Sequence, residues 1–169
     1  MSKLIFISGI HGVGKSTLCG ELNKVVDIST TSCSDIIKSN STYIENSKVV
    51  DKADLNQIAL LVGLDKLRDN DLLLDGHFCL LGKDHKIIEL DYKYFDDIAP
   101  SIIINVFADA NEIFRRLVKR DGDSIPLEVI EKFQDKESHR AYNYARLRNI
   151  PILDYKSGSE ISEVLSLIE

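Results

Sequence analysis

A glycine-rich run near the amino terminus has the residue types and the spacing of a phosphate-binding loop. Residues 9–16 read Gly-Ile-His-Gly-Val-Gly-Lys-Ser, which fits the pattern G-x-x-x-x-G-K-S at every fixed position. Glycines let the backbone turn its N–H groups toward phosphate oxygens, Lys15 adds a positive charge at the β- and γ-phosphates, and the Ser16 hydroxyl can bind Mg²⁺. The residues expected to bind the phosphates are Gly9, His11, Gly12, Val13, Gly14, Lys15, Ser16 and Thr17.

The segments on either side of this run favour a phosphate-binding loop over an ordinary glycine turn. Residues 4–7 are apolar and predict a strand, whereas residues 17–22 suit a helix. A strand, a glycine-rich loop and a helix in this order form the context that the motif requires. A plain turn would leave the lysine and the serine after the last glycine unexplained. The sequence therefore predicts a protein that binds a nucleoside triphosphate.

A second group that suits this chemistry is an acid at the end of a later apolar stretch. Residues 71–76 read Asp-Leu-Leu-Leu-Asp-Gly, which predicts a buried strand that ends at Asp75. A carboxylate in that place can hold Mg²⁺ or one of its water ligands. Asp75 could instead only cap the turn that follows, but the loop upstream favours the metal role. We therefore expect Ser16 and Asp75 to bind the metal.

Three arginines are candidates for neutralising the charge of a moving phosphoryl group. Arg116 and Arg120 lie one turn apart on a predicted helix over 114–121, at the edge of its apolar face, so both could bend over a neighbouring site. Solvated surface charge is the alternative for each, and their position before a turn favours catalysis. Arg140 is as compatible with catalysis as with pairing to Glu137, one helical turn earlier.

The residues that could meet a phosphoryl acceptor are less distinctive. His77 follows the predicted strand end and could accept a proton or hydrogen-bond the acceptor, although a lone histidine more often has a structural role. Ser34 and Asp35 could contact the acceptor or cap the helix that begins there. The three cysteines form no C-x-x-C pair, which predicts free thiols in a reducing cytoplasm; they are Cys19, Cys33 and Cys79.

Alternating strand and helix patterns must position these groups. Near-continuous apolar segments predict five strands that are covered on both faces, namely Lys3–Ser8, Val26–Ser29, Asp71–Asp75, Ser101–Phe107 and Ile150–Asp154. This order predicts a three-layer α/β/α fold with a five-stranded parallel sheet. Ligands then gather at the carboxyl ends of the strands.

Helical patterns fall between these strands. One helix is predicted roughly over 52–70, with a shared apolar face, and another after Asp109. A terminal helix is expected to be capped near 157–159. The face predicted for the first of these helices consists of Leu55, Ile58, Ala59 and Val62.

Length and composition favour one soluble domain. The chain has 169 residues, of which 44% are hydrophobic and 28% charged, and this suits a single core. Its net charge of −6 argues against a general role in gripping nucleic acid, and no apolar stretch is long enough to span a bilayer. Because no signal-peptide pattern is present, we expect a cytoplasmic protein, a monomer or small homo-oligomer, whose partners are small-molecule nucleotides.

Taken in order, the motifs resemble those of the P-loop nucleoside monophosphate kinases, and in particular the small, short-lid adenylate kinases. Residues 32–38 resemble the T-G-D-x-x-R start of the helix that receives the acceptor, and residues 73–76 resemble the strand that ends in Asp-Gly. Residues 116–121 resemble the R-x-x-x-R that opens the lid, and residues 139–145 the helix after it. The resemblance implies ATP, Mg²⁺ and AMP, with an acceptor side formed by Ser34, Asp35, Lys38 and His77.

The resemblance also implies how a single domain over 1–169 is arranged. Acceptor-binding excursions are expected at about 33–70 and 77–97, and a short lid at about 120–127. The chain departs from the pattern on the acceptor side, because Lys38 stands where the family has an arginine. His-Phe-Cys likewise follows Asp-Gly where long-form enzymes have Phe-Pro-Arg, and a lysine cannot form the two parallel hydrogen bonds of a guanidinium.

Phosphoryl transfer is therefore more firmly predicted than the acceptor. Alternatives to AMP are another nucleotide, a small-molecule alcohol or a nucleic-acid end. An alternative of a different class is an ATP-dependent switch or ATPase that acts on a protein partner. A GTPase is disfavoured because no N-K-x-D or T-K-x-D motif follows the loop.

Overall fold

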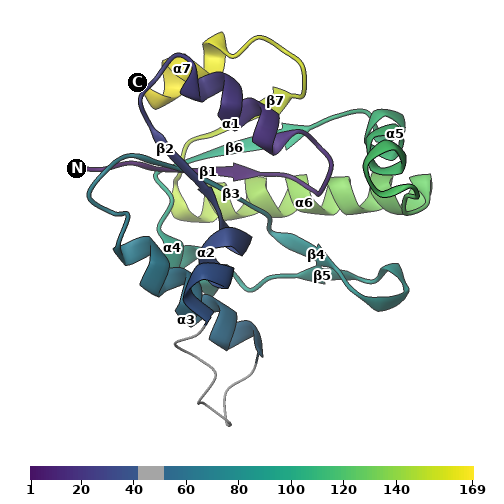
Figure 1. Cartoon of the computed structure of the whole chain (residues 1–169), viewed down its shortest axis with the longest axis horizontal. Coiled ribbons are helices and arrows are strands. Elements are labelled where there is room, and N and C mark those ends of the chain that lie inside the picture. The colour runs from purple at the N-terminus through teal and green to yellow at the C-terminus, as the bar shows by residue number, and fades with distance from the viewer. Residues whose placement is uncertain (42–51) are drawn as a thin grey trace.

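A five-stranded parallel sheet forms the centre of the molecule, as the sequence predicts (Figure 1). The computed structural model describes residues 1–41 and 52–169. The strand order is β2-β3-β1-β6-β7, and every neighbouring pair is parallel. The bounds are β1 Leu4–Ser8, β2 Ser29–Ser32, β3 Leu72–Gly76, β6 Ile102–Phe107 and β7 Ile152–Lys156.

The predicted strands agree best at the centre of the sheet and worst at its edges. β1, β3 and β6 carry almost uninterrupted buried residues, because helices cover both of their faces. The second strand was predicted at Val26–Ser29, which is wrong: β2 is the polar run Ser29–Ser32, exposed or half-buried at the sheet edge. An edge strand is only partly covered, so hydrophobicity does not mark it. β7, at the other edge, begins two residues later than predicted.

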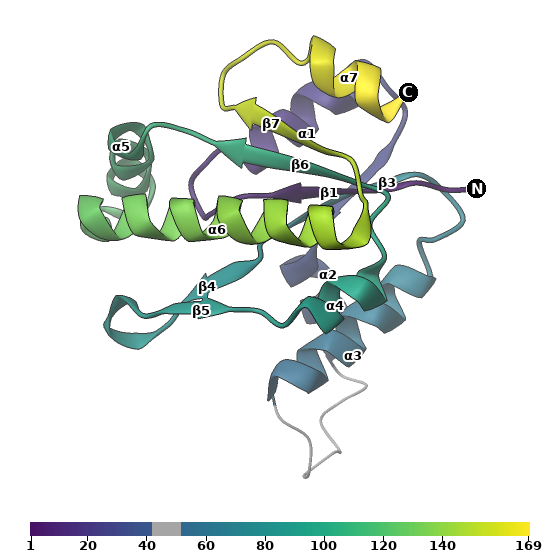
Figure 2. The same ribbon diagram turned by 180° about the vertical axis from the view of Figure 1, so that it is seen from behind.

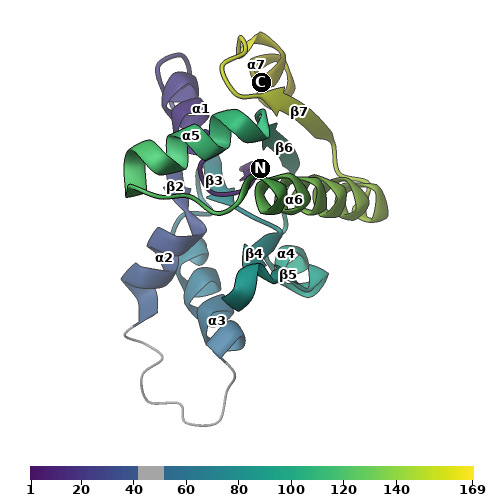
Figure 3. The ribbon, with the colours of Figure 1, turned by 90° about the vertical axis from the view of Figure 1, so that its right-hand side faces the viewer.

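Helices cover the sheet in two layers, which Figure 3 separates. Side chains of α1 and α7 pack on one face, and side chains of α2, α3 and α4 pack on the other, where the long helix α6 also runs across the sheet (Figure 2). Alternate residues of β1 enter the two cores, with Ile5 and Ile7 on the first side and Leu4 and Phe6 on the second. The bounds are α1 Lys15–Asn23, α2 Cys33–Asn40, α3 Lys52–Asp65, α4 Tyr92–Ile98, α5 Ala110–Asp121, α6 Leu127–Arg148 and α7 Ser162–Ile168.

Two details of the helix prediction are corrected. Ile58 was placed on the buried face of its helix, but it is 48% exposed, and α3 instead buries Ala59, Leu60, Gly63 and Leu64. Packing on α2 explains this face, because a Cβ on Gly63 would collide with Ile36 and Asn40. The last helix has no serine cap: Ile161 is its N-cap residue, without a side-chain hydrogen bond.

The two predicted excursions have different structures. Residues 77–97 contain an antiparallel hairpin of β4 (Cys79–Leu81) and β5 (Ile87–Glu89), joined by the 3-10 turn η2 (Lys83–His85). The excursion at 33–70 contains α2 and α3, and its residues 42–51 lie outside the described residues. The short connection between α5 and α6 is a turn, as predicted, and it begins at Gly122, which has a φ of 80°. Within the described part of the chain, no helix is both long and apolar enough to cross a membrane.

Candidate functional site

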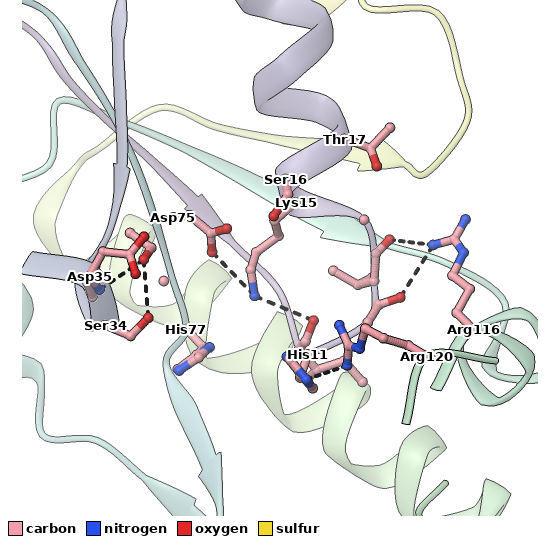
Figure 4. A pocket seen from close by; sticks show the side chains of 17 residues that line it. His11, Lys15, Ser16, Thr17, Ser34, Asp35, Asp75, His77, Arg116 and Arg120 are labelled. Carbon is pink, nitrogen blue, oxygen red and sulfur yellow. Dashed lines mark hydrogen bonds and ion pairs between the residues drawn. The ribbon is translucent and has the colours of Figure 1, made fainter. Parts of the chain in front are cut away.

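A cavity of about 490 Å³ opens at the carboxyl ends of β1, β2 and β3 (Figure 4). Its lining comes from residues 10–17, 32–35 and 75–77, together with Arg116 and Arg120. Parallel strands bring all their carboxyl ends to one edge of the sheet, which is where α/β proteins bind ligands. The fold therefore gathers most of the predicted site residues around one space.

The glycine-rich loop wraps around the start of α1 at the centre of this cavity. Gly12 and Gly14 adopt positive φ values of 85° and 107°, a conformation that residues with a Cβ rarely adopt. Val13 between them is fully buried and fixes the loop to the core. Since the first N–H groups of a helix have no acceptor within the helix, the loop and the first turn of α1 offer several donors to an anion.

Lys15 is held at the bottom of the cavity. Its side chain is largely buried, and its ammonium group donates to the carbonyl oxygen of Gly9 at 2.5 Å and lies 3.6 Å from a carboxylate oxygen of Asp75. Burial raises the pKa of Asp75, whereas the charge of Lys15 and its hydrogen bond lower it. The cation of the phosphate-binding motif and the acid at the end of β3 are therefore direct neighbours.

Arg116 is fixed to the outside of the glycine-rich loop. Its guanidinium donates to the carbonyl oxygens of Val13 at 2.9 Å and Gly12 at 3.4 Å, to Glu112 at 2.5 Å, and to the hydroxyl of Ser157 at 3.2 Å. In this arrangement it supports the loop backbone beside the cavity. The sequence pattern assigns Ser157 only to the cap of the last helix, whereas in the folded chain this serine lies in the loop after β7 and approaches Gly14.

Arg120 extends over the loop one turn further along α5. Its guanidinium contacts the imidazole of His11 and also pairs with Asp121 at 3.2 Å. Burial, Arg120 and Lys15 together lower the pKa of His11, so the imidazole is neutral and can accept from the guanidinium. Arg120 is half-exposed and forms no bond to loop carbonyls, which leaves it freer to move than Arg116.

The opposite side of the cavity, on the left in Figure 4, is formed by α2 and by the chain after β3. Ser32 caps α2, since its hydroxyl accepts from the N–H of Asp35 at 3.1 Å. Ser34 and Asp35 therefore do not cap this helix, and both line the cavity. His77 lines it as well, and burial lowers the pKa of His77 to about 4, with Lys15 and His11 adding to the effect. Its imidazole is neutral near pH 7.

Three predicted site residues do not line this cavity: Gly9, Lys38 and Arg140. Lys38 is exposed on α2. Arg140 lies on the hairpin side of α6, where its guanidinium stacks 3.9 Å from the ring centre of Tyr92 and donates to the carbonyl oxygen of Leu90. Its Nε lies 3.7 Å from a carboxylate oxygen of Glu89.

The predicted alternative for Arg140, a surface pair with Glu137, is wrong. Glu137 is 1% exposed, and its carboxylate accepts the backbone N–H groups of Phe78 and Cys79 at 2.7–2.9 Å. This role of Glu137 is not visible in the sequence, because an acid three residues from an arginine on a helix is the ordinary pattern of a surface ion pair. Only the packing of α6 beside β4 turns the side chain inward.

The residues that face the cavity suit a magnesium–phosphate complex better than thiol or zinc chemistry. Ser16 and Asp75 both line it and offer hard oxygen ligands of the kind Mg²⁺ prefers, alongside phosphates. Among the described residues, no three His, Cys, Asp or Glu side chains gather into a metal cluster. Burial raises the pKa values of the Cys33 and Cys79 thiols to about 12, so neither is a ready nucleophile.

Comparisons with known proteins agree with this geometry. A family model described as an AAA domain matches residues 8–134. The adenylate kinase of Methanothermobacter thermautotrophicus is 23% identical over 184 residues, which cover 99% of this chain and all of that protein.

Solved structures show the same fold at low sequence identity. A candidate kinase from Chloroflexus aurantiacus aligns with a TM-score of 0.59 at 12% identity, and an uncharacterised protein from Eubacterium ventriosum with 0.54 at 13%. Each alignment covers 99% of this chain and 96% of the other.

Proposed function

Because the chain belongs to the AAA-domain family whose model matches residues 8–134, we propose that it is an ATP-dependent kinase that phosphorylates a nucleoside monophosphate, with AMP as the acceptor. The observation that carries this proposal is the position of Lys15. It lies 3.6 Å from Asp75 at the bottom of a cavity that has loop amides and arginines on one side and Ser34, Asp35 and His77 on the other. The adenylate kinase relative, which matches along the whole chain, supports the choice of AMP.

The loop and Lys15 would hold the triphosphate of ATP. Backbone N–H groups donate to its oxygens, and the ammonium group exchanges part of its contact with Asp75 for the β- and γ-phosphates. Ser16 and Asp75 would hold Mg²⁺, which neutralises negative charge on the phosphates when it is bound. Catalysis in such a site consists of positioning and charge neutralisation.

Transfer itself needs an acceptor oxygen in line with the bond that breaks. An oxygen of the acceptor phosphate bonds to the γ-phosphorus while the bond between that phosphorus and the β–γ bridging oxygen breaks, and the electron pair leaves with ADP. Arg120 would move from His11 to the transferring group and neutralise its charge there. A phosphate acceptor requires no general base, which agrees with a neutral His77 that only hydrogen-bonds.

A hydroxyl acceptor is a second candidate, and the charge of the acceptor side favours it. Among the described residues that line this side, the charged groups are the carboxylates Asp35 and Asp75, and the lining cations come from the loop and α5. A carboxylate could take the proton of an attacking hydroxyl, as Asp35 would for an alcohol, another nucleotide's sugar or a nucleic-acid end. An ATPase that acts on a protein partner would need no added acceptor, because water takes the phosphoryl group.

An acceptor screen distinguishes these possibilities. Purified protein is incubated with Mg-ATP and, separately, each nucleoside monophosphate, nucleosides, simple alcohols and a 5′-hydroxyl oligonucleotide. ADP formation is read against protein alone, and the phosphorylated product is identified by mass. We expect AMP to stimulate ADP formation most and to yield ADP as its own product. Stimulation by hydroxyl compounds alone, or by none, contradicts AMP as acceptor.

The turn over 121–126 supplies a further part of this proposal. It lies beside a cavity of about 580 Å³ that reaches from Leu117 and Phe133 to His85 at the tip of the hairpin. We propose that this turn closes over bound ATP as a short lid, and that the molecule works in the cytoplasm as a monomer or small homo-oligomer. Comparing free and two-substrate states by crystallography tests the closure.

A further inference from the structure

A buried carboxylate joins the floor of the cavity to helix α6. Glu137 is 1% exposed, and both of its oxygens accept from the chain that follows β3. The N–H of Phe78 donates at 2.7 and 2.9 Å and that of Cys79 at 2.7 Å. Among the described residues the ion pairs do not include Glu137. Its charge is therefore compensated mainly by backbone donors, an arrangement that is costly unless the donors are held in place.

Glu137 hydrogen-bonds to the segment over residues 76–79, which carries His77 and forms one wall of the cavity. Phe78 is fully buried, and its ring stacks on Phe95 with centres 4.1 Å apart, so its side chain is anchored on one side and its N–H on the other. Gly76, at the start of this segment, is closely packed as well, since a Cβ there would lie 2.8 Å from the ring of Phe6. The backbone of residues 76–79 thus has few ways to relax if the carboxylate is lost.

The carboxylate also interacts electrostatically with groups of the phosphate-binding loop. The backbone N–H of Gly9 and the positive charge of Lys15 both favour its charged form. Lys15 in turn donates to the carbonyl oxygen of Gly9. One side chain therefore lies where the loop, the strand end with Asp75 and the wall with His77 meet.

We infer that Glu137 is a positioning residue for phosphoryl transfer, one that sets the place of His77 and of the acceptor wall relative to the phosphate-binding loop. The inference rests on the proposed function, because the wall is an acceptor wall only if the cavity transfers a phosphoryl group. Glu137 touches no reacting atom in this scheme. Its loss should weaken acceptor binding more than ATP binding, since the loop is also held by Arg116 and by the buried Val13.

The hydrogen bonds from Phe78 and Cys79 should change when Glu137 is protonated, so they can be followed against pH. Burial raises its pKa to about 7, although the hydrogen bonds from Phe78 and Cys79 and the charge of Lys15 favour the charged form. The other charged groups near this position surround Cys79, and they are Arg140, Glu89 and Lys136. A carboxylate accepts all of these N–H groups, whereas a protonated carboxyl loses part of that capacity. The amide protons of Phe78 and Cys79 should therefore shift together between about pH 6 and 8.

The test compares the wild type with Glu137→Gln and, as a matched control, Glu131→Gln, which makes the same change at an exposed position of α6. Nuclear magnetic resonance follows the amide protons of Phe78 and Cys79 against pH and measures how fast they exchange with solvent. In Glu137→Gln we expect the joint amide shift to vanish and both amides to exchange about tenfold faster, because their carboxylate acceptor is lost. Glu131→Gln should match the wild type.

Kinetics provide the functional half of the test. In Glu137→Gln we expect the KM for AMP to rise about tenfold, with the Kd for Mg-ATP within about twofold of the wild type. Unchanged exchange of the Phe78 and Cys79 amides in folded Glu137→Gln overturns the inference, and so does an equal loss of affinity for both nucleotides. If Glu137→Gln does not fold, Glu137→Asp replaces it. A wild type that does not phosphorylate AMP contradicts the proposed function, while the exchange of these two amides still decides whether Glu137 holds the segment that carries His77.

Discussion

The ammonium group of Lys15 lies 3.6 Å from the carboxylate of Asp75, and both side chains are shielded from water at the floor of the cavity. Without a nucleotide, the loop lysine and the acid at the end of β3 neutralise each other. Binding of a magnesium–triphosphate complex would give each of them a new partner of opposite charge. In the free protein the two charges therefore compensate each other. Because each group would bind a different part of the magnesium–triphosphate complex, substitutions of Lys15 and of Asp75 should have distinct effects.

Replacing Lys15 by Met should abolish transfer while the fold is kept. The substitution removes the buried ammonium group of the phosphate-binding loop and leaves Asp75 without its ion pair, so we expect kcat to fall by at least about a hundredfold. Coupled ADP formation measures this, and circular dichroism measures folding. Lys24→Met, at an exposed position that pairs with Glu21 at the end of α1, is the control and should keep wild-type activity. Near-normal activity of Lys15→Met would refute the assigned role.

Replacing Asp75 by Asn should raise the Mg²⁺ concentration needed for half-maximal activity. The amide keeps the size of the side chain but removes the charge that attracts the metal. We expect a shift of about tenfold or more, with ATP binding in the absence of Mg²⁺ retained or tightened because Lys15 is released. A magnesium titration of initial rates measures the shift, and an unchanged titration would leave Asp75 as a structural acid only.

Replacing Arg120 by Ala should lower kcat far more than it weakens ATP binding. The guanidinium rests on His11 and Asp121 and is free to move to the transferring group, so its loss should be felt mainly in the transition state, by about a hundredfold or more. Steady-state rates and calorimetric Kd values for Mg-ATP separate the two effects. Arg115→Ala changes an exposed arginine on the same helix and serves as control. Loss of binding alone would argue against a transition-state role.

Replacing Arg116 by Lys should give the opposite pattern. Its guanidinium bridges two loop carbonyls, Glu112 and Ser157, and an ammonium group cannot reach all of them at once. We expect weaker ATP binding, by several-fold, and a lower melting temperature, with a smaller change in kcat. Differential scanning fluorimetry with and without Mg-ATP tests both expectations. A large kcat loss with unchanged binding would place Arg116 with Arg120.

The histidine of the acceptor wall predicts how stability depends on pH. The pKa of His77 is about 4 in the folded state against an ordinary 6.5, so the unfolded chain binds the extra proton between these values. The stabilisation that the neutral imidazole provides is complete above pH 6.5 and is lost as the pH falls toward 4. The difference in unfolding free energy between the wild type and His77→Gln should therefore decrease by on the order of 2 kcal/mol from pH 7 to 4.5.

The buried carboxylate predicts a trend of the opposite sign. The pKa of Glu137 is raised to about 7 from an ordinary 4.5, so here the folded state holds the extra proton. Stabilisation from this group is complete below pH 4.5 and is lost as the pH rises toward 7. Urea unfolding of wild type, His77→Gln and Glu137→Gln across this range measures both trends. A pH-independent difference for either variant would contradict the corresponding shift.

The central strands and the loop motif could be predicted because each depends on local sequence. A strand covered on both faces must be apolar throughout, and a loop that presents amides to phosphate needs glycines at fixed positions. The edge strand β2 escaped prediction because it is polar and half-covered. The same limit applies to α3, whose buried face depends on where α2 packs against it.

The features of the site likewise fall into those that local sequence defines and those that depend on tertiary packing. The sequence by itself determined that a phosphate-binding loop, an acid after a buried strand and a pair of arginines one turn apart are present, since residue types and short spacings define these features. Only the tertiary structure decided that Arg116 supports the loop, that Arg140 belongs to the hairpin, and that Glu137 lies buried against Phe78 and Cys79. Those roles depend on segments tens of residues apart that meet through packing, and a side chain's charge alone does not reveal which partner the fold brings to it.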